Sequence, residues 1–185
     1  MAKKKAKRSK KSSSRKSSSA PKASRPAARP TPRTVTPYLS ITNAANAIEW
    51  YKKAFGAKEE ARQLGPGGSI MHAALKIGDS SVYMSDLFPG TDMQDPAVAG
   101  PSVSLHVYAK NIDKLWNGGV QNGAKVVMPL ANQFWGDRYG KLTDPFGHSW
   151  SFSYPAKMTK AEKEKMTADA MAQMGGGEHP GHPQP

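Results

Sequence analysis

Residues 36–58 read TPYLSITNAANAIEWYKKAFGAK, and residues 103–125 read VSLHVYAKNIDKLWNGGVQNGAK. Each stretch starts with alternating apolar residues typical of a strand, continues with apolar residues at helical spacing and ends in Gly-Ala-Lys. Ile48 and Leu115, on the two helical faces, lie 67 residues apart, and so do the two Gly-Ala-Lys triplets. The chain therefore contains an internal repeat whose unit begins with a strand and a helix.

Three further strand-like stretches follow each helix. The predicted strands span residues 58–64, 70–77 and 80–85 in the first half and residues 125–128, 138–143 and 149–154 in the second half. Turns rich in Gly, Asp and Pro separate several of them, and a linker rich in the same residues joins the halves. The repeat predicts an α+β fold with two βαβββ modules, residues 36–88 and 101–155, within one domain of residues 36–155.

The excess positive charge lies in the N-terminal residues. The formal net charge is +13, and residues 1–36 contain eight Lys, five Arg and no acidic residue. Residues 1–35 are rich in Ser and Pro and poor in large apolar side chains, so we expect a disordered tail. Its basic residues, between positions 3 and 33, favour non-specific contact with nucleic acid or another polyanion. A solubilising extension and a cleaved targeting segment are the alternatives.

The C-terminal residues predict a separate helix. Thr159 and Glu162 have the spacing of a capping box, so we expect a helix within residues 156–175 and a disordered tail over residues 176–185.

The chain contains no cysteine, which excludes disulfides and thiol nucleophiles. No apolar run approaches the roughly 20 residues needed to span a bilayer, and we expect a cytoplasmic protein.

Alternation along the strands sorts their side chains onto two faces. One face carries apolar residues such as Leu39, Val103 and Phe152 and suits packing against the helices. The opposite face carries hydroxyl groups and a histidine, with His106 as its most distinctive member. This face is too polar for a dry core, so it either meets bulk water or lines a wet ligand cavity.

Side chains on the polar face and in the 134–140 segment are candidate ligand contacts. His106 is a candidate anchor, with a structural histidine held by neighbouring tyrosines as the alternative. Arg138 is suited to bind a carboxylate while Trp135 stacks on a planar group, with a surface Asp137–Arg138 ion pair as the alternative. The predicted ligand-binding set is Tyr38, His72, His106, Tyr108, Trp135, Arg138, Tyr139 and Ser151.

Four short motifs carry a family resemblance: AIEWYKKAFGA at 47–57, MHA at 71–73, FWGDRYG at 134–140 and DPFGH at 144–148. With the paired modules, they resemble the vicinal oxygen chelate superfamily of glyoxalases, extradiol dioxygenases and bleomycin resistance proteins. The PhnB-type, glyoxalase-like branch is the most similar. The resemblance covers residues 36–155 and implies a curved mixed sheet around a cavity and a homodimer.

In metal-dependent members of that superfamily, His, Gln and Glu from the first and last strands of each module bind a divalent ion. The resemblance places these positions, within one residue, at Thr36, Val82, Ser104 and Ser151. None of these is a good ligand for a divalent ion, and residues 61–161 contain no glutamate. We therefore expect no metal and no other cofactor.

Three functions remain open at this point. The resemblance favours a metal-independent, bleomycin-resistance-like protein that binds a planar or acidic small molecule in its cavity. A metal-dependent lyase or dioxygenase of the vicinal oxygen chelate type is the first alternative. A nucleic-acid-associated protein that uses the basic tail is the second. Whether the chain is an enzyme stays undecided.

Overall fold

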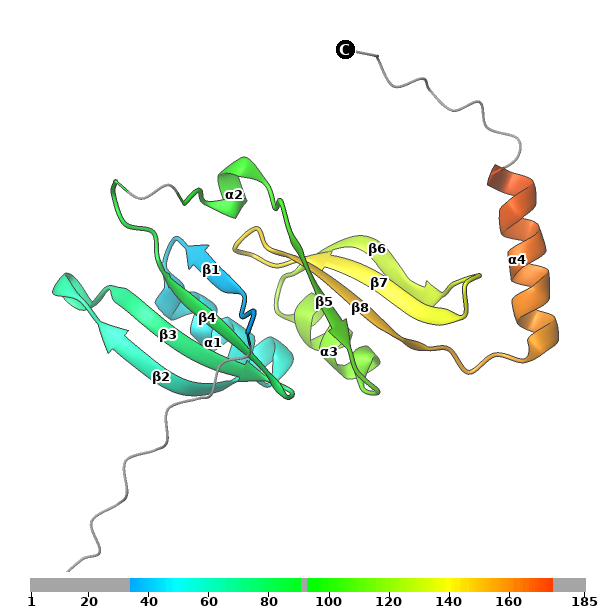
Figure 1. Ribbon diagram of the computed structural model, residues 1–185, viewed down its shortest axis with the longest axis horizontal. Helices are drawn as coiled ribbons and strands as arrows, with labels where there is room; N and C mark the ends of the chain where they lie inside the picture. The colour runs from blue at the N-terminus through cyan, green and yellow to red at the C-terminus, as the bar shows by residue number, and fades with distance from the viewer. Residues whose placement is uncertain (1–33, 91–92, 175–185) are drawn as a thin grey trace, which may run out of the picture.

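The computed structural model describes residues 34–90 and 93–174. It contains two βαβββ modules side by side (Figure 1), which confirms the predicted α+β architecture. The first module comprises β1 (Tyr38–Ile41), α1 (Ala44–Phe55), β2 (Lys58–Leu64), β3 (Ile70–Ile77) and β4 (Ser80–Asp86). The second comprises β5 (Ser104–Tyr108), α3 (Ile112–Gln121), β6 (Lys125–Asn132), β7 (Asp137–Thr143) and β8 (Ser149–Pro155). The predicted tails, residues 1–35 and 176–185, lie outside the described residues except for residues 34 and 35.

The two modules have the same strand order, as the internal repeat predicts. Sheet A runs β1-β4-β3-β2 and sheet B runs β5-β8-β7-β6. The pairs β1–β4 and β5–β8 are parallel, and all other pairs are antiparallel. Both sheets are therefore mixed, and β8 is a central strand flanked by β5 and β7.

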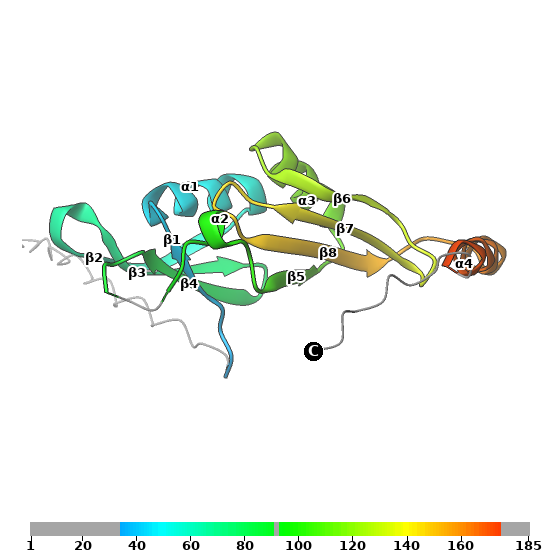
Figure 2. The same cartoon turned by 90° about the horizontal axis from the view of Figure 1, so that it is seen from above.

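The helices α1 and α3 lie on one side of the two sheets, and the strands lie in front of them in Figure 1. Figure 2 shows α1 and α3 together above the sheets. The helices approach closely because Gly118 lacks a side chain: a Cβ there would lie 2.1 Å from the carbonyl oxygen of Ala54. The opposite faces of the sheets, which we call the open faces, carry no helix among the described residues.

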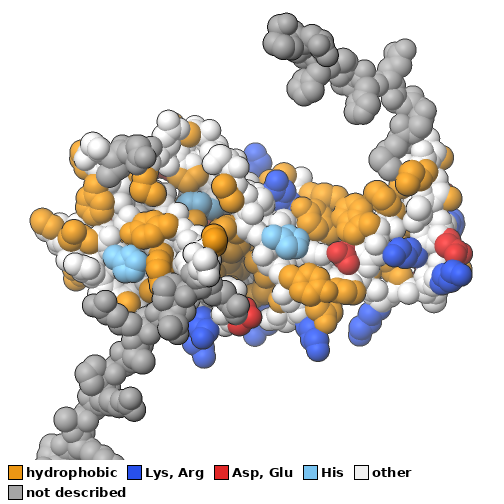
Figure 3. Space-filling model, viewed as in Figure 1, with side chains coloured by type: hydrophobic (Ala, Val, Ile, Leu, Met, Phe, Trp, Pro, Cys, Tyr) orange, Lys and Arg blue, Asp and Glu red, His pale blue; other side chains and the backbone are white. Residues whose placement is uncertain are grey.

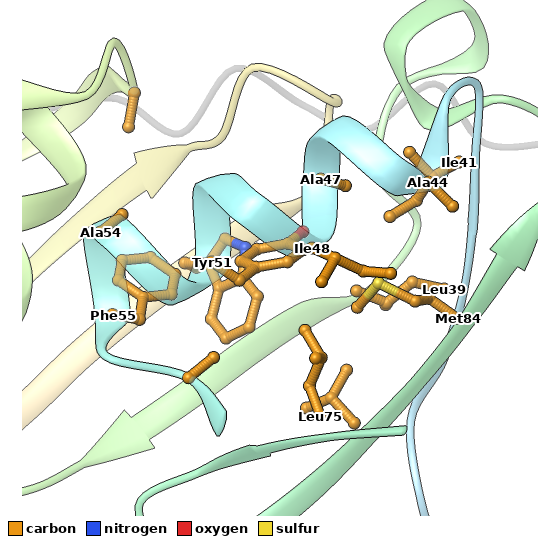
Figure 4. Packing of buried hydrophobic residues seen from close by; sticks show 14 of the residues in the cluster. Leu39, Ile41, Ala44, Ala47, Ile48, Tyr51, Ala54, Phe55, Leu75 and Met84 are labelled. Carbon is orange, nitrogen blue, oxygen red and sulfur yellow. The ribbon is translucent and has the colours of Figure 1, made fainter. Parts of the chain in front are cut away.

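A single apolar core connects the modules. Figure 4 shows Ile48 of α1 pointing toward Leu39 and Met84 of sheet A. Farther along the same helix, the ring centroid of Phe55 lies 4.9 Å from that of Trp150 in β8. Burying such apolar side chains stabilises the fold by roughly 1.5–3 kcal/mol each. One residue departs from the predicted pattern: Val103 precedes β5 and is 68% exposed.

A buried carboxylate, that of Asp144, organises the β7–β8 turn. It accepts hydrogen bonds from Tyr51 Oη at 2.6 Å and from Trp150 Nε1 at 2.8 Å. It also accepts from the backbone amides of Phe146 at 3.0 Å and His148 at 2.9 Å. Burial alone would raise the pKa of Asp144, but contacts with His148, Tyr51 and Trp150 outweigh burial and lower it. The carboxylate therefore stays charged inside the protein.

The linker between the modules contains a four-residue helix, α2 (Pro96–Ala99), that the sequence analysis did not predict. It lies against the β7–β8 turn, where a Cβ on Gly147 would come within 2.3 Å of the amide nitrogen of Ala97. Gly147 also has a φ of 87°, a conformation that side chains disfavour. Glycine at this position thus allows the linker to cross directly over the turn.

The C-terminal helix, α4 (Lys160–Met174), stands at the far end of sheet B (Figure 1). Its start is the predicted capping box: Thr159 N donates to Glu162 Oε2 at 2.7 Å, and Glu162 N donates to Thr159 Oγ1 at 3.2 Å. Thr167 Oγ1 donates to the carbonyl of Phe134 at 3.1 Å and links the helix to the β6–β7 loop. No helix in the described ranges is long and apolar enough to cross a membrane.

Candidate functional site

A row of small residues crosses the open face of sheet B. Ser149, Ser151 and Ser153 alternate along the central strand β8, and each is at least nine-tenths buried. Larger side chains of the flanking strands lie on both sides of this row. Ser151 is in register with His106 of β5 and Lys141 of β7. Ser153 is in register with Tyr108 of β5 and Tyr139 of β7. We call this arrangement the serine trough; its floor is Ser149, Ser151 and Ser153, and its walls are His106, Tyr108, Tyr139 and Lys141.

Each serine of the floor has a hydrogen-bond partner. Ser149 Oγ donates to Ser104 Oγ at 3.0 Å, and Ser153 Oγ donates to Asp137 Oδ2 at 2.8 Å. Ser151 Oγ lies 2.8 Å from Nδ1 of His106. This contact fixes the imidazole, and its Nε2 has no hydrogen-bond partner among the described residues. The trough therefore presents one oriented ring nitrogen to a ligand.

Aromatic rings form one end of the trough. The rings of His106 and Tyr139 are nearly parallel, with an interplanar angle of 23° and a centroid distance of 6.4 Å. Trp135 meets Tyr139 at 70° with a centroid distance of 5.7 Å, and it is 43% exposed. A planar molecule is able to stack on such exposed ring faces. Figure 3 shows that hydrophobic side chains are common on this side of the molecule.

The structure does not bring Arg138 into the trough. Arg138 points to the helix side of sheet B, where its Nε and Nη2 donate to Asp113 Oδ1 at 2.9 and 2.7 Å. The cation on the open face is Lys141, two residues after Tyr139 and in register with Ser151. Its ammonium group has no ion-pair partner among the residues that the structure describes. Sequence reasoning missed Lys141, although strict alternation from Tyr139 would have found it.

Two other predicted residues, Tyr38 and His72, lie together on the open face of sheet A. The Nδ1 atom of His72 is 3.4 Å from Tyr38 Oη, and the ring centroids are 5.8 Å apart. Tyr83 adds a third ring, 5.0 Å from that of His72. These residues form a cluster on sheet A, whereas the serine trough lies on sheet B.

The residues at the positions corresponding to the superfamily's metal ligands do not fit a divalent ion. Val82 is buried in the apolar core, and Ser104 and Ser151 are neutral hydroxyls already bonded within sheet B. Thr36, just before β1, offers only another hydroxyl. Divalent ions in proteins are held mainly by carboxylate, imidazole and carbonyl groups. Within residues 34–90 and 93–174, no group of three or more His, Cys, Asp or Glu could hold a metal ion.

Comparison with known families and proteins gives a consistent result. A family model described as Glyoxalase/Bleomycin resistance protein/Dioxygenase superfamily matches residues 34–152. An uncharacterized protein of Mycobacterium bovis is 39% identical over 127 residues, which cover 66% of this chain and 84% of that protein. Protein YjdN of Escherichia coli is 26% identical over 137 residues and matches over 91% of its own length.

Two solved structures share the fold. Protein PA1353 from Pseudomonas aeruginosa has a TM-score of 0.53 and 30% identity, and the match covers 65% of this chain and 96% of that one. A PhnB protein from Bacillus cereus, described as a putative 3-demethylubiquinone-9 3-methyltransferase, has a TM-score of 0.55. Its identity is 20%, with 66% of this chain and 99% of that chain covered, so this likeness concerns the fold alone.

Proposed function

Because the chain belongs to the glyoxalase/bleomycin resistance protein/dioxygenase superfamily, we propose that it binds a planar, anionic small molecule in the serine trough without a metal ion. One observation carries the proposal: an unpaired cation, Lys141, lies beside two near-parallel rings over a buried hydroxyl floor. Membership of the superfamily supports a ligand site on this face, and the side chains present there define the chemical class of the ligand.

Three interactions support this ligand class. The ammonium group of Lys141 attracts a carboxylate or sulfonate, and Nε2 of His106 supplies a second polar contact. The exposed ring of Trp135 and the half-buried ring of Tyr139 stack on a flat apolar body, and each such aromatic pair adds about 0.5–1.5 kcal/mol beyond area burial. The site thus supplies one cation and two aromatic surfaces, with the carboxylate of Asp137 held by Ser153, a pattern suited to an aromatic acid.

The proposal is one of binding rather than turnover. Lyases and dioxygenases of this superfamily rely on a metal that withdraws charge from the substrate. The hydroxyl donors at the corresponding positions here do not fit such an ion, and the described trough residues supply stacking and hydrogen bonds instead. Polyanion contact through residues 3–33 lies outside the described residues and stays a prediction.

We also propose that the protein is a homodimer whose partner covers an open face. The superfamily resemblance supports it, and so does the exposure of Tyr38 (42%) and Tyr108 (62%) on the two open faces. Size-exclusion chromatography with light scattering tests it, and a mass equal to that of one chain at micromolar concentration would refute it.

The ligand proposal is tested with matched probes and matched variants. We expect 2-naphthoate to bind more tightly than the neutral 2-naphthamide in isothermal titration calorimetry. Lys141→Gln should weaken 2-naphthoate binding about tenfold, equivalent to 1.4 kcal/mol, and leave 2-naphthamide unchanged. Arg138→Gln is the control on the same strand and should change neither affinity. Equal losses in both variants, or no saturable binding of fused-ring carboxylates, would reject the trough as the site.

A further inference from the structure

A cleft of about 1260 Å³ lies between the two modules. The first module contributes residues 35–37 before β1, the end of α1 and residues 77–82 around the β3–β4 turn, and the second contributes β5 and α3. The floor of the cleft includes apolar side chains such as Leu105 and Leu115. The serine trough lies over the open face of sheet B, whereas the cleft borders the outer edge of that sheet, and His106 and Tyr108 border both.

The cleft runs along an unpaired strand edge. Five consecutive residues, 105–109, line it. Side chains of neighbouring strand residues point to opposite faces, so all five can border one hollow only if it lies beside the strand. The strand concerned, β5, pairs with β8 on one side and with no strand on the other among the described residues.

The backbone groups at this edge can be assigned individually. Ala109 N donates to Ser153 O at 3.4 Å, so Ala109 directs its amide toward β8. Because amide direction alternates along a strand, Ser104, His106 and Tyr108 direct theirs away from β8, and two of them, His106 and Tyr108, line the cleft. No hydrogen-bond partner for these backbone groups exists within the described part of the chain. An unpaired edge of this kind is a template for a further strand.

Another wall of the cleft, formed by α3 of the same module as β5, carries polar amide side chains. Asn111, Asn117 and Gln121 belong to or border α3 and line the cleft, and their carboxamides have no hydrogen-bond partner among the described residues. A carboxamide both donates and accepts hydrogen bonds, as a peptide group does. This wall therefore complements the backbone of an extended chain lying along β5.

The charges at the cleft favour an acidic occupant. Lys53 and Lys114 line it, and neither forms an ion pair with any residue that the structure describes. The acidic residue in the lining is Asp79, which already accepts a hydrogen bond from Ser80 at 3.0 Å. The charged side chains of the chain's own residues 1–33 are all positive, so this segment is a poor electrostatic match for the two lysines of the cleft.

We propose that an extended acidic peptide segment of a partner protein adds to the outer edge of β5 as a further strand. Backbone hydrogen bonds to His106 and Tyr108 hold it, the carboxamides on the α3 wall contact polar groups of the peptide, and Lys53 and Lys114 attract its acidic side chains. The five residues of β5 extend over about 16 Å at the usual rise per residue, so the site takes five or so peptide residues.

The first experiment measures affinity and charge selectivity. Fluorescein-labelled VEVDVE is titrated with the full chain, and fluorescence anisotropy is compared with that of VKVKVK and of a proline-containing control, VEPDPE. We expect saturable binding of VEVDVE, at least about tenfold weaker binding of the basic peptide, and loss of binding with proline, which cannot donate a backbone hydrogen bond. Absence of binding, or equal affinity for the three peptides, overturns the proposal.

The second experiment locates the bound peptide. Amide hydrogen exchange of the full chain is followed by NMR with and without saturating VEVDVE. The amides of His106 and Tyr108 should exchange at least about tenfold more slowly in the complex, whereas that of Val107, already directed to β8, should change little. Unchanged exchange at His106 and Tyr108 overturns strand addition even if the peptide binds.

Variants of the protein complete the test. Ser104→Pro removes one outward amide at the first position of β5, and Ser104→Ala is its control because it loses the same hydroxyl but keeps the amide. Lys114→Gln removes a cleft charge, and Lys110→Gln removes a neighbouring charge outside the lining. Binding of VEVDVE should weaken several-fold in the first member of each pair. Equal effects within both pairs would overturn the proposed site.

Discussion

The phenol of Tyr51 donates a 2.6 Å hydrogen bond to Oδ2 of Asp144, so a helix of the first module supplies a partner to a buried carboxylate of the second. Burial, and then the adjacent carboxylate, raise the pKa of Tyr51 well above its usual value. The phenol therefore remains a donor at any physiological pH, and the interaction between the modules persists.

Removing this donor should destabilise the whole fold. In Tyr51→Phe the ring packing is kept, but one buried oxygen of Asp144 loses a hydrogen bond, at a cost of about 1–3 kcal/mol. Urea unfolding at pH 7 measures the loss. Tyr154→Phe is the control, because the Tyr154 hydroxyl has no hydrogen-bond partner among the described residues. Equal stability of the two variants would show that the Tyr51–Asp144 bond contributes little.

The lowered pKa of Asp144 predicts a loss of stability in acid. Its contribution is fully present above the unfolded-state pKa of about 3.9 and is lost as pH falls through the lower folded-state value. Asp144→Asn should lower stability at pH 7 and flatten the dependence between pH 5 and pH 2. Urea midpoints at several pH values measure both effects. Parallel pH profiles for variant and wild type would assign the acid sensitivity to other carboxylates, such as Glu59, whose pKa is also lowered.

Gly118 should tolerate no side chain. A Cβ at this position would lie 2.1 Å from the backbone oxygen of Ala54, so Gly118→Ala must push α1 and α3 apart. Overpacking of this kind typically costs about 1–3 kcal/mol. Thermal unfolding should show a clear fall in Tm, and the exposed neighbour substitution Asn117→Ala should leave Tm nearly unchanged. A Tm for Gly118→Ala that equals the control would contradict the close helix contact.

Ser151 should act on ligand binding through His106. Ser151→Ala removes the hydroxyl 2.8 Å from Nδ1, so the imidazole loses its fixed orientation. Affinity for 2-naphthoate should fall a few-fold, and the ¹⁵N shifts of the ring should move toward those of a free tautomeric mixture. Ser149→Ala, on the same strand but bonded to Ser104, should leave the ring shifts unchanged. Identical spectra for both variants would remove His106 from the proposed site.

Much of the fold could be predicted from the sequence because the pattern is repeated. The predicted strands at 58–64 and 70–77 coincide with β2 and β3, where turn residues mark the ends clearly. The helix α2 was missed because four residues contain too little periodicity to be recognised. Val103 was assigned to the apolar face because alternation alone does not show where a strand begins.

The candidate site was predictable in part. Alternation placed His106 and Ser151 on the same face, and the structure puts them in contact. Arg138 was predicted from the chemistry of its guanidinium group and not from its position in the strand. Its partner, Asp113, lies in α3, so the alternation of strand residues does not indicate this ion pair. The cleft was not predicted, because its walls come from both modules and their relative placement is not encoded in the repeat.

The close passage of the linker over Gly147 has a consequence for recognition. Hinge motion between the two modules would require α2 to move away from the β7–β8 turn. This contact therefore keeps the two modules at a fixed separation before a ligand binds. A rigid receptor loses little freedom on association, and more of the contact energy is kept as affinity. Selectivity should then depend on the shape of the ligand, because the protein changes its own conformation little.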